Sequence, residues 1–100
     1  MTVGAEVETA TSIIVAELEK QTKHMRLPPH VVDFLRQSLS LMDLTGVQRQ
    51  LALVARVPDI HTRNYEQVQI RARLQRTTRI FVDRTVAAGI KEGDDPEDYF

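Results

Sequence analysis

The chain lacks cysteine and has few aromatic residues. Without cysteine it can form no disulfide, supply no thiol nucleophile and hold no zinc through thiolates. Its aromatic residues are three phenylalanines and two tyrosines, with no tryptophan. Because the hydrophobic fraction is nevertheless 42%, a globular core must be built mainly from Leu, Ile and Val.

Long apolar runs and a basic leader are also missing. No apolar stretch approaches the ~18 residues that a transmembrane helix needs. Residues 1–20 lack the basic start of a secretory signal peptide. These absences predict a cytoplasmic protein with no membrane partner. A length of 100 residues suits one domain with one modest core.

The sequence contains no residue pattern that is typical of an active site or a metal site. His24, His30 and His61 lie in separate segments and form no HxxxH or HxxE pattern. The four glycines are scattered, so no Gly-rich phosphate-binding loop is present. We therefore expect a protein that is not an enzyme, with no catalytic residue, no metal and no cofactor.

Hydrophobic periodicity and helix breakers predict an all-α fold, a compact bundle of about four helices with a long fourth helix. Pro28-Pro29 and Pro58 separate predicted helices, and Gly89 fits the position just after a helix end. The predicted helices span residues 5–25, 29–42, 46–57 and 59–88, and an acidic tail follows at 89–100.

Two local predictions concern how these helices begin and pack. Thr45, with Gln48 three residues later, has the spacing of a capping box at the start of the third helix. In the first helix, Val7, Ile14, Leu18 and Met25 share one face at helical spacing. Glu17 is expected to point away from that face.

The fourth predicted helix is long for a chain of this size. At 1.5 Å per residue, about 30 residues extend ~45 Å, which exceeds the diameter of a compact domain of this length. We expect either a break, most readily at Thr77-Thr78, or a partner that covers the excess. The second alternative predicts a homodimer.

The net charge of −1 hides a strongly uneven distribution. Residues 1–19 contain four glutamates and no basic residue. Residues 61–84 contain six arginines and two acids, a formal charge of +4. Residues 91–100 contain one lysine and five acids, a formal charge of −4. The acidic ends can therefore pair with the basic middle, within one chain or between chains.

Four arginines project from one side of the long helix, within an arc of about 140° at ~100° per residue. They are Arg73, Arg76, Arg79 and Arg84. Three interpretations remain open at this stage: a solvated helix face, a surface that pairs with acidic groups of a partner protein, and a nucleic-acid-binding surface.

Arg71 differs from these four because its projection falls within the apolar arc, near Val82. A buried guanidinium needs a carboxylate partner or an anionic ligand. Glu17, Asp33 or Asp43 could provide the carboxylate within the fold. Arg71 is therefore also a candidate ligand-binding residue for a small-molecule effector.

Residues 57–100 resemble part of the effector-binding and dimerisation domain of TetR-family transcriptional regulators. The resemblance rests on Val57-Pro58-Asp59-Ile60, on the Arg-rich helix, on Ala87-Ala88-Gly89-Ile90-Lys91-Glu92-Gly93 and on Asp95-Pro96-Glu97. It implies ligand sensing and dimerisation without DNA contact, because residues 1–44 do not resemble the family's DNA-binding helices. No site residue of the family transfers to this sequence.

These observations favour a non-enzymatic helical binding or self-association module, with a TetR-like effector-binding domain as its most specific form. One alternative is a small nucleic-acid-binding protein that uses the Arg-rich helix. Another is a protein–protein interaction module of a bacterium or phage, since arginine outnumbers lysine ten to three, as in GC-rich genomes.

Overall fold

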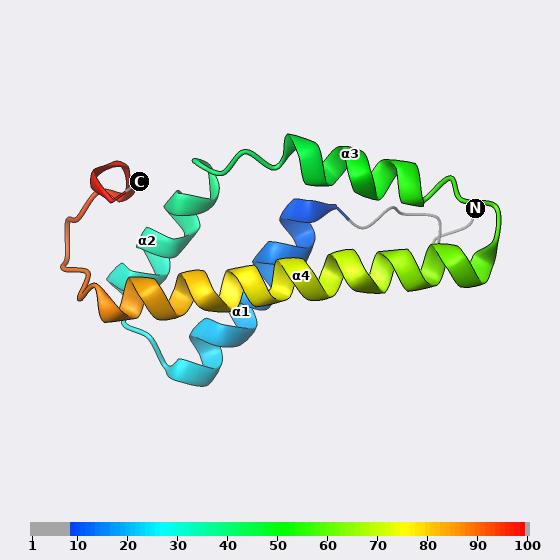
Figure 1. Cartoon of the computed structure of the whole chain (residues 1–100). Helices are drawn as coiled ribbons and strands as arrows, with labels where there is room; N and C mark the ends of the chain where they lie inside the picture. The colour runs from blue at the N-terminus through cyan, green and yellow to red at the C-terminus, as the bar shows by residue number, and fades with distance from the viewer. Residues whose placement is uncertain (1–8, 100) are drawn as a thin grey trace, which may run out of the picture.

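The computed structural model describes residues 9–99, which form four α-helices and one short 3-10 helix (Figure 1). The elements are α1 (Ala10–Met25), α2 (Pro29–Leu39), α3 (Thr45–Val54), α4 (Ile60–Ala87) and the 3-10 helix η2 (Pro96–Asp98). These described residues contain no strand. The predicted all-α fold with a long fourth helix is therefore confirmed. Val7 of the predicted first-helix face lies outside the described residues.

The long helix α4 forms the axis of an elongated molecule that measures 48 × 26 × 25 Å (Figure 1). α1 crosses it near the middle and makes the most extensive contact with it. α3 runs back along the N-terminal half of α4, while α2 packs near its C-terminal half. After α4 the chain turns back, so that η2 contacts α2.

The buried apolar residues form two clusters along α4. The first joins α1, α3 and α4, and its members are Ala10, Ile13, Ile14, Leu51, Val54, Ile70 and Leu74. The second joins α1, α2 and α4, and its members are Leu18, Val31, Leu35 and Val82. Because α1 contributes to both clusters, it connects α3 to α2 through the interior. Both clusters are aliphatic, as the composition requires.

The predicted capping box at Thr45 and Gln48 is wrong. Thr45 is the first residue of α3, which follows Leu44 and has no side-chain cap. Gln48 instead points at α1, where its Oε1 accepts a hydrogen bond from the Ala10 N–H at 2.8 Å. Gln48 therefore makes a long-range hydrogen bond to α1 instead of the predicted local bond within α3. The capping box of the fold belongs to α1, between Thr9 and Ser12.

Glu17 is also placed differently from the prediction, because it is buried rather than directed into solvent. Its Oε2 accepts a hydrogen bond from Gln21 Nε2 at 3.1 Å. A buried carboxylate needs such a donor, since leaving it unpaired is costly. The partner lies one turn later in the same helix, so the pair is a local feature of α1.

α4 continues without a break through Thr77-Thr78, contrary to the predicted weak point. Thr78 and Thr85 are buried, and their hydroxyls donate to the carbonyl oxygens of Leu74 and Phe81 at 2.8 and 2.9 Å. Each hydroxyl is thus satisfied by its own helix and can enter the core. Both helix ends follow the sequence prediction, with a side-chain cap at Asp59 and a positive φ of 67° at Gly89.

Candidate functional site

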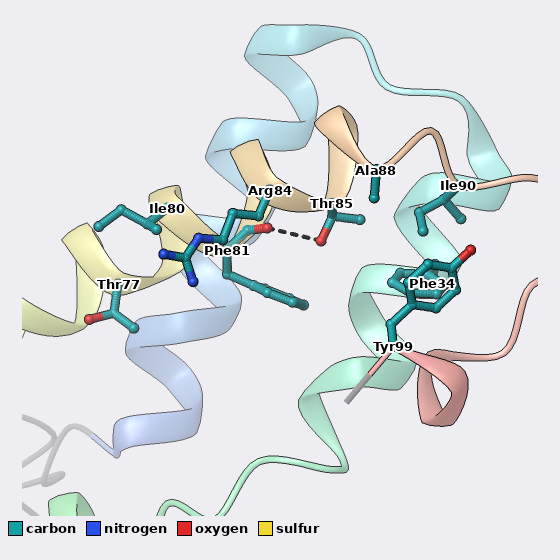
Figure 2. A pocket seen from close by; sticks show the side chains of 9 residues that line it. All are labelled: Phe34, Thr77, Ile80, Phe81, Arg84, Thr85, Ala88, Ile90 and Tyr99. Carbon is teal, nitrogen blue, oxygen red and sulfur yellow. Dashed lines mark hydrogen bonds between the residues drawn. The ribbon is translucent and has the colours of Figure 1, made fainter.

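A hollow with a predominantly apolar lining lies beside the last turns of α4 (Figure 2). It has a volume of about 430 Å³ and opens to solvent between α4, α2 and the segment that follows α4. We call it the C-terminal groove. Its lining residues are Phe34, Thr77, Ile80, Phe81, Arg84, Thr85, Ala88, Ile90 and Tyr99.

One face of α4 supplies most of this lining. Thr77, Ile80, Phe81, Arg84 and Ala88 are spaced by three, one, three and four residues, so they project from the same side of the helix. The Thr85 hydroxyl is bonded to the Phe81 carbonyl, as the dashed line in Figure 2 shows. Most of the groove lining is apolar, and Arg84 is the charged side chain in it.

The far wall of the groove is the C-terminal segment, which Tyr99 and Asp94 hold in place. The Tyr99 ring packs edge-on against Phe34 of α2, with centroids 5.3 Å apart and an interplanar angle of 86°. Its hydroxyl donates to Asp94 Oδ2 at 2.9 Å, and the Lys91 N–H donates to the same oxygen at 2.7 Å. The aromatic contact thus joins the segment to α2, and the hydrogen bonds to Asp94 hold Tyr99 and Lys91 together within the segment.

These hydrogen bonds alter the proton affinity of both groups. The Lys91 N–H and then the Tyr99 hydroxyl stabilise the carboxylate, so the pKa of Asp94 lies below its usual value. Conversely, donation to Asp94 stabilises the neutral phenol, so the pKa of Tyr99 lies above its usual value. Near neutral pH the pair is therefore a phenol that donates to a carboxylate.

A second contact fixes the beginning of this wall. His30 Nε2 lies 3.1 Å from the Ile90 carbonyl oxygen, and the Ile90 side chain is buried. Gly89 and Gly93 have φ values of 67° and 89°, which suit glycine and permit the turns that bring the chain back to α2. The groove is therefore shaped by residues 89–99 folding back onto α2.

Large apolar side chains at the rim of the groove remain open to solvent. Ile80 is 46% exposed and Tyr99 is 47% exposed. Other large apolar side chains are exposed on α3 and on other faces of α4, including Leu53, Tyr65 and Val68. Single exposed apolar residues are normal, whereas an apolar lining around a hollow is typical of a binding surface.

The four arginines of the predicted charged face are all exposed, and they divide into two groups. Arg84 lines the groove, and Arg73 lies on the same side of α4, four residues before the lining residue Thr77. Neither Arg76 nor Arg79 lines the groove, and of the two Arg79 projects further from it around the helix. Within residues 9–99, none of the four forms a salt bridge with a carboxylate.

The expected burial of Arg71 is wrong, since its side chain is exposed. The buried face of α4 shifts along the helix, from Ile70 and Leu74 to Thr78 and Val82. At ~100° per residue, the directions of Ile70 and Val82 differ by about 120°. A single helical projection merges these two faces into one wide arc and wrongly includes Arg71. The prediction of an effector site at Arg71 depended on that burial.

Among residues 9–99, no group of three or more His, Asp or Glu side chains could hold a metal ion. A second hollow of about 470 Å³ is mostly polar and brings His30 and Asp33 of α2 near Lys91 and Asp94. In this second hollow, Asp94 already accepts hydrogen bonds from the Tyr99 hydroxyl and the Lys91 N–H. Its Asp94 therefore helps to hold the C-terminal segment that forms the far wall of the groove.

Comparison with protein-family models, curated proteins and solved structures finds no match for this chain. None of the helices described is both long and apolar enough to cross a membrane.

Sequence reasoning identified Arg84 but missed the rest of the groove. Phe34 and Ile90 were not expected to meet, because they belong to segments that only the turn after α4 brings together. The sequence predicts an acidic tail around Tyr99, whereas the structure packs the Tyr99 ring against Phe34. The available signal was the pair of glycines at 89 and 93, which permits a chain reversal.

Proposed function

We propose that the chain is a non-enzymatic binding and self-association module that forms a homodimer through the C-terminal groove. The observation that carries this proposal is the open apolar lining beside α4, with Ile80 and Tyr99 half exposed at its rim. Covering such a surface stabilises a complex by roughly 25 cal/mol per Å² of apolar area. In a two-fold dimer the same surface is covered on both copies.

The shape of the groove favours a polypeptide occupant over a small molecule. Its volume of about 430 Å³ lies in the range of ligand pockets, which is ~300–1,000 Å³. However, ligand pockets enclose most of a ligand, whereas this groove has half-exposed side chains at its rim. A broad protein surface covers such a rim more completely.

The resemblance to TetR-family effector domains gives the most specific form of this proposal. In that form the chain would combine dimerisation with the sensing of a small effector, and the groove would serve the dimerisation. A cytoplasmic location and a bacterial or phage origin complete the proposal and rest on sequence composition alone.

A second candidate function is nucleic-acid binding by Arg73, Arg76, Arg79 and Arg84, favoured by their exposure and their lack of salt bridges within the described residues. It predicts that labelled duplex DNA binds and that its affinity falls steeply with salt. The double variant Arg76→Glu/Arg79→Glu would then weaken binding strongly. Fluorescence anisotropy that detects no binding at low salt excludes this candidate.

The dimer is tested by sedimentation-velocity or light-scattering measurement of mass over a range of protein concentrations. We expect the wild type to dimerise and Ile80→Glu to weaken dimerisation at least ~10-fold, because it places a charge in an apolar interface. Val68→Glu is the matched control, since Val68 is 55% exposed on α4 but does not line the groove. A monomeric wild type, or equal effects of the two variants, contradicts the proposal.

A further inference from the structure

The two sides of the C-terminal groove carry opposite charge. On the α4 side, Arg84 lines the groove and Arg73 extends the same helix face by about one turn beyond Thr77. On the other side, Tyr99 comes directly after the exposed acids Glu97 and Asp98. An apolar groove therefore lies between a basic helix edge and an acidic segment.

These charges are not neutralised within the described part of the chain. Neither Arg73 nor Arg84 forms a salt bridge with a carboxylate among residues 9–99. The acids that shape the C-terminal segment are used locally. Asp94 accepts from Tyr99 and from the Lys91 N–H, and Asp95 accepts from the Glu97 N–H at 3.0 Å. Glu97 and Asp98 remain exposed on the segment that ends at the groove-lining Tyr99, and Glu97 also borders a separate hollow against α2.

This arrangement is self-complementary. A two-fold axis through the groove places the basic edge of one copy opposite the acidic segment of the other, and the same contact forms a second time. We infer that a second copy of this chain occupies the groove, with Arg73 and Arg84 of each copy facing Glu97 and Asp98 of its partner. This inference rests on the proposed self-association and specifies its register.

The same charges discriminate against other occupants. Nucleic acid approaching Arg84 would also meet the acidic side of the groove, where its phosphates would be repelled. An uncharged apolar partner would leave both charged edges without a counterpart. A second copy covers the apolar lining and also supplies counter-charges for both the basic edge and the acidic segment. These opposite charges also fix the orientation of the second copy.

Charge reversal on each side tests the register. We expect Arg73→Glu/Arg84→Glu to weaken dimerisation at least ~10-fold, because each copy then presents acidic groups on both sides of its groove. Glu97→Lys/Asp98→Lys should do the same with basic groups. An equimolar mixture of the two variants should form a heterodimer at concentrations where each alone is monomeric. Native mass spectrometry distinguishes the heterodimer, since the two variants differ in mass.

The matched control is Arg76→Glu/Arg79→Glu, which makes the same charge change at two exposed arginines of α4 that do not line the groove. We expect this variant to dimerise like the wild type. Circular dichroism checks that each variant keeps its helical content. If a charge-reversal variant loses its fold, the neutral variant Arg73→Gln/Arg84→Gln or Glu97→Gln/Asp98→Gln takes its place. These neutral variants should weaken the dimer by removing the charge attraction, without adding repulsion.

The outcomes separate this inference from the function on which it rests. Monomerisation by Ile80→Glu with no effect of the charge variants overturns the register but supports groove-mediated dimerisation. The register is also overturned if Arg73→Glu/Arg84→Glu and Arg76→Glu/Arg79→Glu weaken dimerisation equally. It is likewise overturned if the equimolar mixture of the two charge-reversal variants stays monomeric. A wild type that is monomeric at every concentration overturns both.

Discussion

The hydrogen bond between Gln48 and the Ala10 N–H offers a direct test of how α3 is joined to α1. Ala10 is completely buried and begins α1, where backbone N–H groups have no partner in the helix itself. Gln48 Oε1 accepts from this N–H at 2.8 Å. The substitution Gln48→Ala removes the acceptor and leaves the N–H of a buried residue without its partner.

The expected loss of stability follows from that burial. An unpaired buried N–H costs roughly 1–3 kcal/mol, whereas the net value of an exposed hydrogen bond is smaller. The Thr9–Ser12 capping box satisfies other donors of this helix end and cannot take over the role of Gln48. For a domain of this size, 1 kcal/mol lowers the melting temperature by roughly 4–8 °C. We therefore expect Gln48→Ala to lower it by at least ~4 °C.

Thermal unfolding followed by far-ultraviolet circular dichroism measures this change, with urea unfolding as a second measure. Gln48→Glu should keep most of the stability, because a carboxylate still accepts the hydrogen bond and its charge suits a helix N-terminus. Gln50→Ala is the control, since Gln50 is exposed on the same helix. If Gln48→Ala unfolds at the same temperature as Gln50→Ala, the contact does not join the two helices.

Two further predictions concern the core and the C-terminal segment. Leu74→Ala truncates a buried residue of the α1–α3–α4 cluster and should cost ~2–5 kcal/mol of unfolding free energy in urea; no loss would show that Leu74 lies outside the core. Because the folded-state pKa of Asp94 is depressed, its stabilising effect is present above the usual Asp pKa of ~3.9 and is lost as pH falls through the folded-state value. The Tyr99 ring resonances in NMR should therefore shift toward those of an unpacked ring below about pH 4, and Asp94→Asn should abolish this titration.

Local sequence patterns predicted the helices well because their signals lie within a few residues. Pro29 begins α2, and Asp59 and Gly89 mark the two ends of α4. The predicted ends of the second and third helices, at residues 42 and 57, lie three residues beyond the observed ends at Leu39 and Val54. Apolar periodicity continues through the turns that follow these helices, so it does not locate their ends.

Side-chain partners were predicted less well because they depend on how the helices cross. Gln48 has the sequence spacing of a local cap, yet its partner is 38 residues away. Arg71 was expected in the core because a flat projection cannot show that the buried face of α4 moves around the helix. The groove depends on three segments at once, and Arg84 is the lining residue that the sequence predicts as part of a binding surface.

The structural feature that favours a partner differs from the one that the sequence suggested. The sequence suggested that a helix of ~45 Å would extend beyond its own bundle. Instead the molecule is 48 Å long, and α3, α1 and α2 follow one another along the whole of α4. Length alone therefore requires no partner. What does favour one is the C-terminal end, where residues 89–99 fold back onto α2 rather than onto α4 and leave Ile80 half exposed.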